Sequence, residues 1–118
     1  MEETSWRTGQ QIHMTEGDTA NVRFEIVSSH DLDGAAIEWV VGRDDEITRS
    51  LTLAPHTEVE GVYVADTIIE AGDIAGLSRQ RQSRSLPHEA RVTKAGESES
   101  LAVLTGWFTI YRSLFAQT

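Results

Sequence analysis

The alternation that decides the fold runs through residues 20–26, which read ANVRFEI. The first, third, fifth and seventh residues of this stretch are apolar and the residues between them are polar, as in a strand with one face in a core and one in water. Residues 35–41 read AAIEWVV and repeat the pattern, with Trp39 on the apolar side. The turn that follows, residues 42–46, is acidic and ends this second strand. The chain is therefore predicted to consist mainly of β-strands.

The same two-residue period predicts further strands at residues 47–53, 62–69, 89–94 and 98–111. Pro55 has no backbone donor and is expected to stop the first of them. Residues 70–77 break the alternation, because their apolar side chains recur at every third position, as in one or two helical turns.

The closing strand changes parity along its length. Leu101 and Val103 share one parity, whereas Phe108 and Ile110 share the other. A bulge or bend at Gly106 would return both pairs to one core face, and burial on both faces is the alternative.

About seven short strands with a turn signal roughly every ten residues favour a β-sandwich, in which two sheets cover each other's apolar faces. A small closed barrel obeys the same alternation and stays open as an alternative. Residues 12–118 form one predicted domain. Residues 1–11 are polar enough to be a flexible N-terminal arm.

Composition excludes several classes of function. A length of 118 residues fits one domain, and a formal net charge of −9 disfavours nucleic acid as a partner. The chain has no cysteine, which rules out disulfides and thiolate metal sites. No apolar run reaches the ~20 residues of a membrane helix, and the acidic start is unlike a secretory signal, so we expect neither a membrane contact nor export.

Five short motifs occur in a characteristic order: Gly17-Asp18-Thr19, Leu32-Asp33-Gly34-Ala35, Gly61-Val62-Tyr63-Val64, the turn from Ala71 to Leu77, and Leu104-Thr105-Gly106. This layout, over most of residues 14–112, resembles the immunoglobulin-like domains of tailed-phage virion proteins, of the type found at the N-terminus of the baseplate upper protein. Residues 78–87 depart from the family, which usually has a Pro-Gly turn and a Tyr there. The resemblance implies an immunoglobulin-like β-sandwich with one short helical turn.

The resemblance also implies a function. We expect a non-enzymatic virion component, assembled in the host cytoplasm, that binds other virion proteins of the tail or baseplate in many copies, as a homo-oligomer or symmetric array. A capsid-decorating or head-to-tail joining protein is the close alternative. From another class, a carbohydrate-binding module uses the same sandwich and presents aromatic platforms to sugar rings.

The stretch from Ser78 to Pro87 is an arginine-rich insertion, and its Arg79, Arg81 and Arg84 are candidate partner-binding residues. Guanidinium groups suit carboxylates on a neighbouring subunit. A solvated loop is the equally weighted alternative, and without an aromatic side chain in the loop to stack bases, nucleic acid is disfavoured.

Trp6 and Trp107 are the other candidate partner-binding residues, whereas Trp39 is assigned to the core. Trp107 faces outward if Phe108 is buried, and either a neighbouring molecule or an internal edge would cover it. Trp6 either anchors the N-terminal arm to an adjacent subunit or packs on its own domain.

No catalytic, metal or cofactor site is predicted. Residues 30–34 and 44–46 are acidic, but they lack the ligand spacing of a calcium loop and are interpreted as solvated turns. The four histidines have no paired spacing for zinc and are expected to be exposed or on edge strands. No nucleophile elbow or phosphate loop occurs, although carboxylates brought together by a sandwich remain an alternative.

Overall fold

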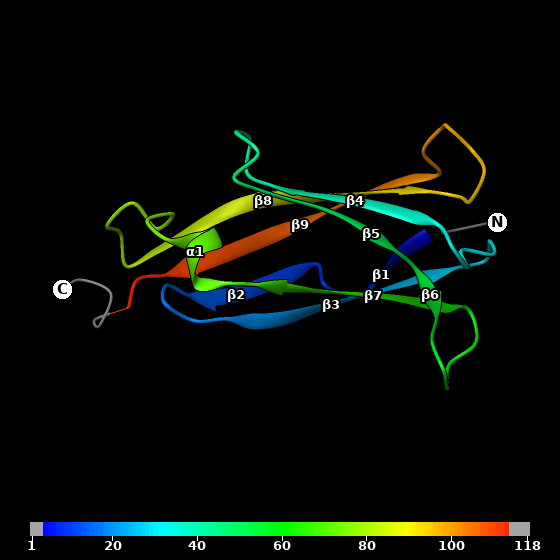
Figure 1. Cartoon of the computed structure of the whole chain (residues 1–118), viewed down its shortest axis with the longest axis horizontal. Coiled ribbons are helices and arrows are strands. Elements are labelled where there is room, and N and C mark those ends of the chain that lie inside the picture. The colour runs from blue at the N-terminus through cyan, green and yellow to red at the C-terminus, as the bar shows by residue number, and fades with distance from the viewer. Residues whose placement is uncertain (1–3, 114–118) are drawn as a thin grey trace.

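The computed structural model describes residues 4–113 as two β-sheets that face each other (Figure 1). Over this range the strands are β1 (Thr4–Thr8), β2 (Gln11–Thr15), β3 (Ala20–Ser28), β4 (Ala36–Val41), β5 (Ile47–Thr52), β6 (Ala54–Pro55), β7 (Val62–Ile69), β8 (Ser83–Thr93) and β9 (Ala102–Tyr111). One short helix, α1 (Ala71–Ile74), connects β7 to the turns before β8. No helix of the described range is long and apolar enough to cross a membrane.

The order of the strands identifies the fold. One sheet has the order β1-β3-β7-β6 and the other β2-β9-β8-β4-β5, with β2 parallel to β9 and the other neighbours antiparallel. These are the A-B-E-D and G-F-C sheets of an immunoglobulin sandwich, the second extended by a C′ strand and by the second half of the N-terminal strand. The predicted immunoglobulin-like β-sandwich is confirmed, and the closed barrel is wrong because the strands divide between two sheets.

Most of the residues that the alternation assigned to the core lie in it. Trp39 lies at its centre and is completely buried. Its ring centroid is 5.0 Å from that of Phe24 on β3 and 6.1 Å from that of Phe108 on β9. β7 has the predicted bounds, residues 62–69. β5 ends at Thr52, before Pro55, but the chain continues into the other sheet, where Ala54–Pro55 pairs with β7 at the edge.

The N-terminal segment is a paired strand where we expected a loose arm. Residues 4–8 form β1, which pairs with β3, and residues 11–15 form β2, which pairs with β9 in the opposite sheet. Gly9 allows the crossing between sheets, since its φ is +113° and a Cβ there would lie 2.8 Å from Cδ1 of Phe24. Polarity alone gave no sign of this, because an edge strand tolerates many polar residues.

A hydrogen-bonded chain holds the crossing to the core. The indole N–H of Trp39 donates to Nδ1 of His88 at 3.2 Å, so the proton of a neutral His88 lies on Nε2. That nitrogen donates to the carbonyl oxygen of Gln10, also at 3.2 Å. The Gln10 oxygen additionally accepts the backbone N–H of Trp107 at 2.9 Å. Both ring nitrogens of a buried imidazole are thus satisfied, which burial requires.

His88 is 1% exposed, and the expectation that it would be exposed or on an edge strand is wrong. Burial lowers the pKa of His88, although the backbone carbonyls of Gln10 and Gly9 act in the opposite direction. Phe24 and His88 come from the two strands that carry the disulfide in antibody domains, and here they flank the buried tryptophan instead.

The closing strand contains no bulge. The register between β8 and β9 runs without a shift from Ser83–Tyr111 to Val92–Ala102, so the bulge offered at Gly106 is wrong, and the alternative of burial on both faces is wrong as well. Val103 instead points outward and is 48% exposed. Gly106 has a different role, since a Cβ on it would lie 2.0 Å from the Gln10 oxygen and 2.6 Å from Nε2 of His88.

We predict that Gly106→Ala destabilises the fold by about 3 kcal/mol, because backbone and a buried ring must both move to admit one methyl group. The matched control is Gly72→Ala, since Gly72 lies in α1 and a Cβ added to it would meet nothing within 4 Å. That change should be neutral or stabilise by up to about 1 kcal/mol. Urea unfolding of both variants checks this, and equal midpoints would contradict it.

The lowered pKa of His88 predicts a pH-dependent stability. Below about pH 6.5 the unfolded chain binds a proton at this residue that the folded chain refuses, so the free energy of unfolding falls with pH by at most about 1.4 kcal/mol per unit. Above that pH the contribution of neutral His88 to the free energy of unfolding is fully present and no longer changes. His88→Gln should flatten this slope between about pH 7.5 and 5.5, whereas His13→Gln, at an exposed ring, should retain it. Urea titrations at several pH values measure it, and an unchanged slope in His88→Gln would refute the assignment.

Candidate functional site

A row of exposed apolar side chains, with Thr105 and Thr109 between them, lies on the outer face of the five-stranded sheet. It consists of Val103, Trp107 and Tyr111, every fourth residue of β9, and their exposed fractions are 48%, 55% and 40%. The same side of a strand repeats every second residue, so the three side chains share one face over roughly 26 Å. We call them the β9 strip.

The orientation of Trp107 follows from the register of its neighbours. Phe108 and Ile110 point into the core and are fully buried, so Trp107 points outward, as predicted. It lies between Gln11 on β2 and Pro87 on β8. No internal edge of the described chain covers the indole, which is 55% exposed, so the alternative of an internal cover for Trp107 is wrong.

The end of the strip is fixed by a stacked pair. The imidazole of His13 on β2 lies parallel to the ring of Tyr111, with centroids 5.9 Å apart and planes at 19°. Nδ1 of His13 and the Tyr111 hydroxyl are 3.1 Å apart, at hydrogen-bonding distance. This pairing fixes the orientation of Tyr111, which is still 40% exposed.

An arginine cleft lies beside the start of β8. Its lining includes Arg43 from the β4–β5 turn, Arg79 and Arg81 from the turns after α1, and Arg84 from β8, and its volume is about 480 Å³. Pro87 also lines the cleft and is the register partner of Trp107, so the cleft and the β9 strip adjoin.

The structure brings the three sequence-predicted arginines together but gives them different roles. Arg84 lies on β8, which begins at Ser83, so the expected loop over residues 78–87 is a strand in its second half. Nη1 of Arg84 donates to the Leu77 carbonyl at 2.8 Å, and Nη2 lies 3.7 Å from Oε1 of Glu46. Arg84 is therefore committed within the chain.

Arg43, Arg79 and Arg81 are exposed, and within residues 4–113 none of them has an ion-pair partner. Tight turns set the position of the loop: the backbone N–H of Arg79 donates to Gly76 and that of Arg81 to Ser78, while Arg79 has a φ of +53°. Asp44 and Glu46 also line the cleft, so its four guanidinium groups face two carboxylates, and the excess positive charge is suited to bind carboxylates. Arg43 was missed because it lies almost forty residues away in sequence, in a turn that is otherwise acidic.

Trp6 does not belong to this surface. Its ring is partly buried against the core, 5.8 Å from Phe24 and 5.7 Å from His88 between centroids. Its indole N–H donates to the Thr105 carbonyl at 2.9 Å. Of the two alternatives for Trp6, the structure therefore has the one in which the side chain packs on its own domain.

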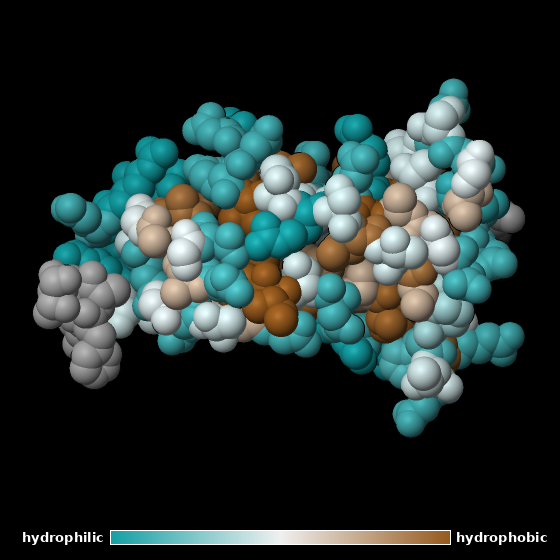
Figure 2. Space-filling view, viewed as in Figure 1, coloured by the Kyte–Doolittle hydropathy of each residue, from teal (hydrophilic) through white to brown (hydrophobic). Residues whose placement is uncertain are grey.

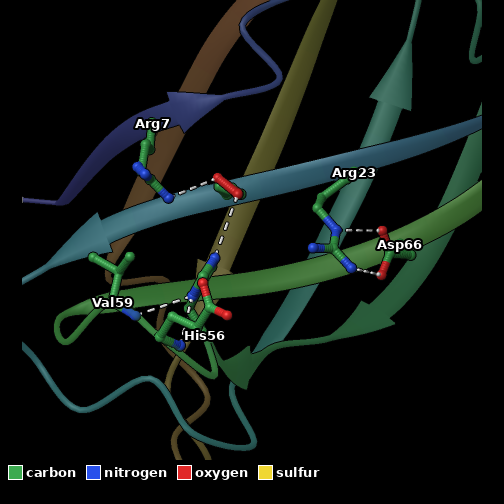
Figure 3. Close-up of polar contacts among 7 residues, drawn as sticks. Arg7, Arg23, His56, Val59 and Asp66 are labelled. Atoms are coloured by element: carbon green, nitrogen blue, oxygen red, sulfur yellow. Dashed lines mark hydrogen bonds and ion pairs between the residues drawn. The ribbon is translucent and has the colours of Figure 1, made fainter.

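The outer face of the four-stranded sheet differs, because its charges are paired. Figure 3 shows Arg7 donating to the Glu25 carboxylate at 3.0 Å, with Nε2 of His56 4.0 Å from the other oxygen. Arg23 makes a bidentate pair with Asp66, which raises the pKa of the Arg23 guanidinium through that hydrogen bond and charge (Figure 3). The exposed Arg23–Asp66 pair adds little stability, whereas the Glu25 carboxylate is buried beneath its partners, and together the pairs leave few free charges on this face.

The acidic turns form no metal site. In residues 4–113, no three potential ligands converge in a way that would hold a cation. In the turn at residues 31–34, Oδ1 of Asp31 accepts the backbone N–H of Asp33, as an ordinary turn residue does.

Comparison with known proteins gives no match, either to a protein-family model or to a curated sequence.

The division of roles among the arginines is testable. Arg84→Ala should destabilise the fold by about 1–3 kcal/mol, because it leaves the Glu46 carboxylate, 12% exposed, without its counter-charge and removes the donor to Leu77. Arg81→Ala, at an exposed side chain in the same cleft, should change stability by less than about 0.5 kcal/mol. If urea unfolding shows that Arg84→Ala and Arg81→Ala lose the same free energy of unfolding, the structural role assigned to Arg84 is wrong.

Proposed function

We propose that this chain is a non-enzymatic structural protein of tailed-phage virions, an immunoglobulin-like module attached in many copies to the tail or baseplate. A capsid-decorating or head-to-tail joining protein would use the same mechanism elsewhere in the particle. The setting comes from the sequence resemblance, and the mechanism from the surface. The chain would be assembled in the host cytoplasm and remain in the virion.

The β9 strip is the observation that supports this proposal most directly. A folded domain with a complete core gains nothing by exposing Trp107, Val103 and Tyr111 in one row, whereas an adhesion surface does. Burying the exposed half of a tryptophan contributes on the order of 2 kcal/mol, typical of a central interface residue. The adjoining cleft carries Arg43, Arg79 and Arg81, which suit the carboxylates of a second, separate contact.

Individually weak contacts are sufficient for a protein present in many copies. A subunit held at one contact meets the next at high effective concentration, so a modest affinity becomes a stable attachment through repetition. The net charge of −9 keeps the unattached subunit soluble and disfavours the viral nucleic acid as its partner.

The exposed Trp107 ring also favours one candidate from another class. Carbohydrate-binding sandwiches stack sugar rings on such a platform, and His13 and Tyr111 extend the aromatic surface beside it. A titration of the purified chain with a glycan panel, followed by tryptophan fluorescence, separates the two. Saturable quenching that disappears in Trp107→Ser would support glycan binding in place of assembly.

We predict that Trp107→Ser reduces incorporation into particles by about tenfold or more, in line with the lost burial. Particles are produced with the chain supplied as wild type or variant, purified, and inventoried by mass spectrometry. The matched control is Ile68→Ser, which removes a side chain of similar exposure, 57%, from the outer face of the opposite sheet. Ile68→Ser should be incorporated like wild type.

Two outcomes would overturn the proposal. Peptides of the wild-type chain missing from purified particles would remove the virion assignment. Equal incorporation of Trp107→Ser and wild type, with unchanged unfolding midpoints, would remove the β9 strip as the contact.

A further inference from the structure

The two ends of the sandwich differ in the charges that they leave unpaired. At one end lie the loops at residues 29–35, 56–61 and 94–101, on the right of Figure 1. These loops contain one lysine, Lys94, and six carboxylates: Asp31, Asp33, Glu58, Glu60, Glu97 and Glu99. No cationic side chain of residues 4–113 lies within ion-pair distance of any of the six.

The β8–β9 hairpin is the most prominent of these acidic loops. Residues 95–100 are all exposed, and the turn is closed by the N–H of Glu97 donating to the Lys94 carbonyl at 3.1 Å. Figure 1 shows this loop projecting from the end of the sandwich, and Figure 2 shows hydrophilic residues on the loops at both ends. Glu97 and Glu99 are thus carried on a narrow tip.

The arginine cleft lies at the other end of the same strand. β8 begins beside the cleft at Ser83 and reaches the hairpin after Thr93, and its eleven residues span roughly 36 Å. The molecule measures 49 Å along its longest axis. Within one chain the acidic tip therefore cannot reach Arg79 and Arg81, but it can reach those of a second copy.

We propose that copies of this chain associate head to tail, with the Glu97 and Glu99 hairpin of one copy docked in the arginine cleft of the next. The inference rests on the proposed function, because it names a second copy as one partner of the assembly module. Copies stacked end to end make a heterologous contact, which leaves a free tip and a free cleft at the two ends and so extends into rings or filaments. Arg43, Arg79 and Arg81 supply the guanidinium donors, and the two glutamates supply the carboxylates.

The salt dependence of such a contact is set by two electrostatic effects, a repulsion between whole molecules over long distances and an attraction between the docked groups over short ones. Each copy carries a net charge of −9, so whole molecules repel each other at low ionic strength. At about 0.1 M salt the screening length is about 10 Å, which suppresses repulsion between distant parts of a 49 Å molecule but not attraction at the docked tip. At about 1 M salt the tip contact is screened as well. Association should therefore be strongest at intermediate salt.

Paired charge reversals test the proposal. Arg79→Glu with Arg81→Glu reverses the cleft, and Glu97→Arg with Glu99→Arg reverses the hairpin. In each variant alone, the cleft and the hairpin carry charges of the same sign and repel each other. Each should therefore sediment as a single chain of 13.1 kDa at millimolar concentration. An equimolar mixture restores opposite charges at every junction and should associate as wild type does, with an average mass that rises with concentration past that of a dimer.

Two matched proteins complete the experiment. Arg23→Glu with Arg91→Glu makes the same change in net charge as the cleft reversal but outside the cleft and the 95–100 tip, and it should associate like wild type. Trp107→Ser should also associate like wild type, because the β9 strip is not in this contact.

Wild-type chain that stays monomeric at every salt concentration, or a mixture no larger than its two components, would overturn the proposal. Loss of association in Trp107→Ser would also overturn it, in favour of a contact between sheet faces. A failure here with Trp107-dependent incorporation into particles intact would leave the proposed function standing.

Discussion

A buried imidazole is the constraint on which the rest of this structure depends. His88 links Trp39 in the centre of the core to the Gln10 carbonyl, at the point where the N-terminal strand crosses from one sheet to the other. An imidazole without partners in an apolar interior costs free energy, so both bonds must form together. The second bond requires the Gln10 backbone to come close to β9, and Gly106 is the residue that leaves room for it. A polar group in the core thereby fixes the position of a strand at its edge.

That internal constraint determines what the outer surface presents. Because the Gln10 carbonyl also accepts the backbone N–H of Trp107, β2 continues from there in parallel register with β9, pairing Ile12 with Phe108. Phe108 then faces the core, and the indole of Trp107 faces away from it. The exposed strip follows from the same hydrogen bonds that seal the interior. Burying Trp107 within the described sandwich would break this register, so its exposure is a fixed feature of the fold.

Alternation predicted most of the fold because it reflects a local property, the two faces of a strand. It was sufficient for β7, for the core position of Trp39 and for the outward direction of Trp107. It was not sufficient for β8, although Leu86 and His88 continue the parity of Ala90 and Val92, because arginines and Pro87 suggested a loop. Pro87 is tolerated there because β4 ends at Val41, which pairs with His88, and the proline lies just beyond. The convergence of Arg43 with Arg79, and the crossing at Gly9, depend on tertiary contacts that no local pattern contains.

The core, the β9 strip and the arginine cleft are all in contact with one strand, β8. β8 carries His88 inward to the core, Pro87 outward beside Trp107, and Arg84 at its start, where the bond to Leu77 shapes the cleft. Its far end supports the hairpin with Glu97 and Glu99. A strand held on both sides by neighbours and through its centre by a satisfied polar group has little freedom to shift its register. The cleft, the strip and the acidic tip are therefore kept at fixed separations, which repeated addition of identical subunits in an assembly requires.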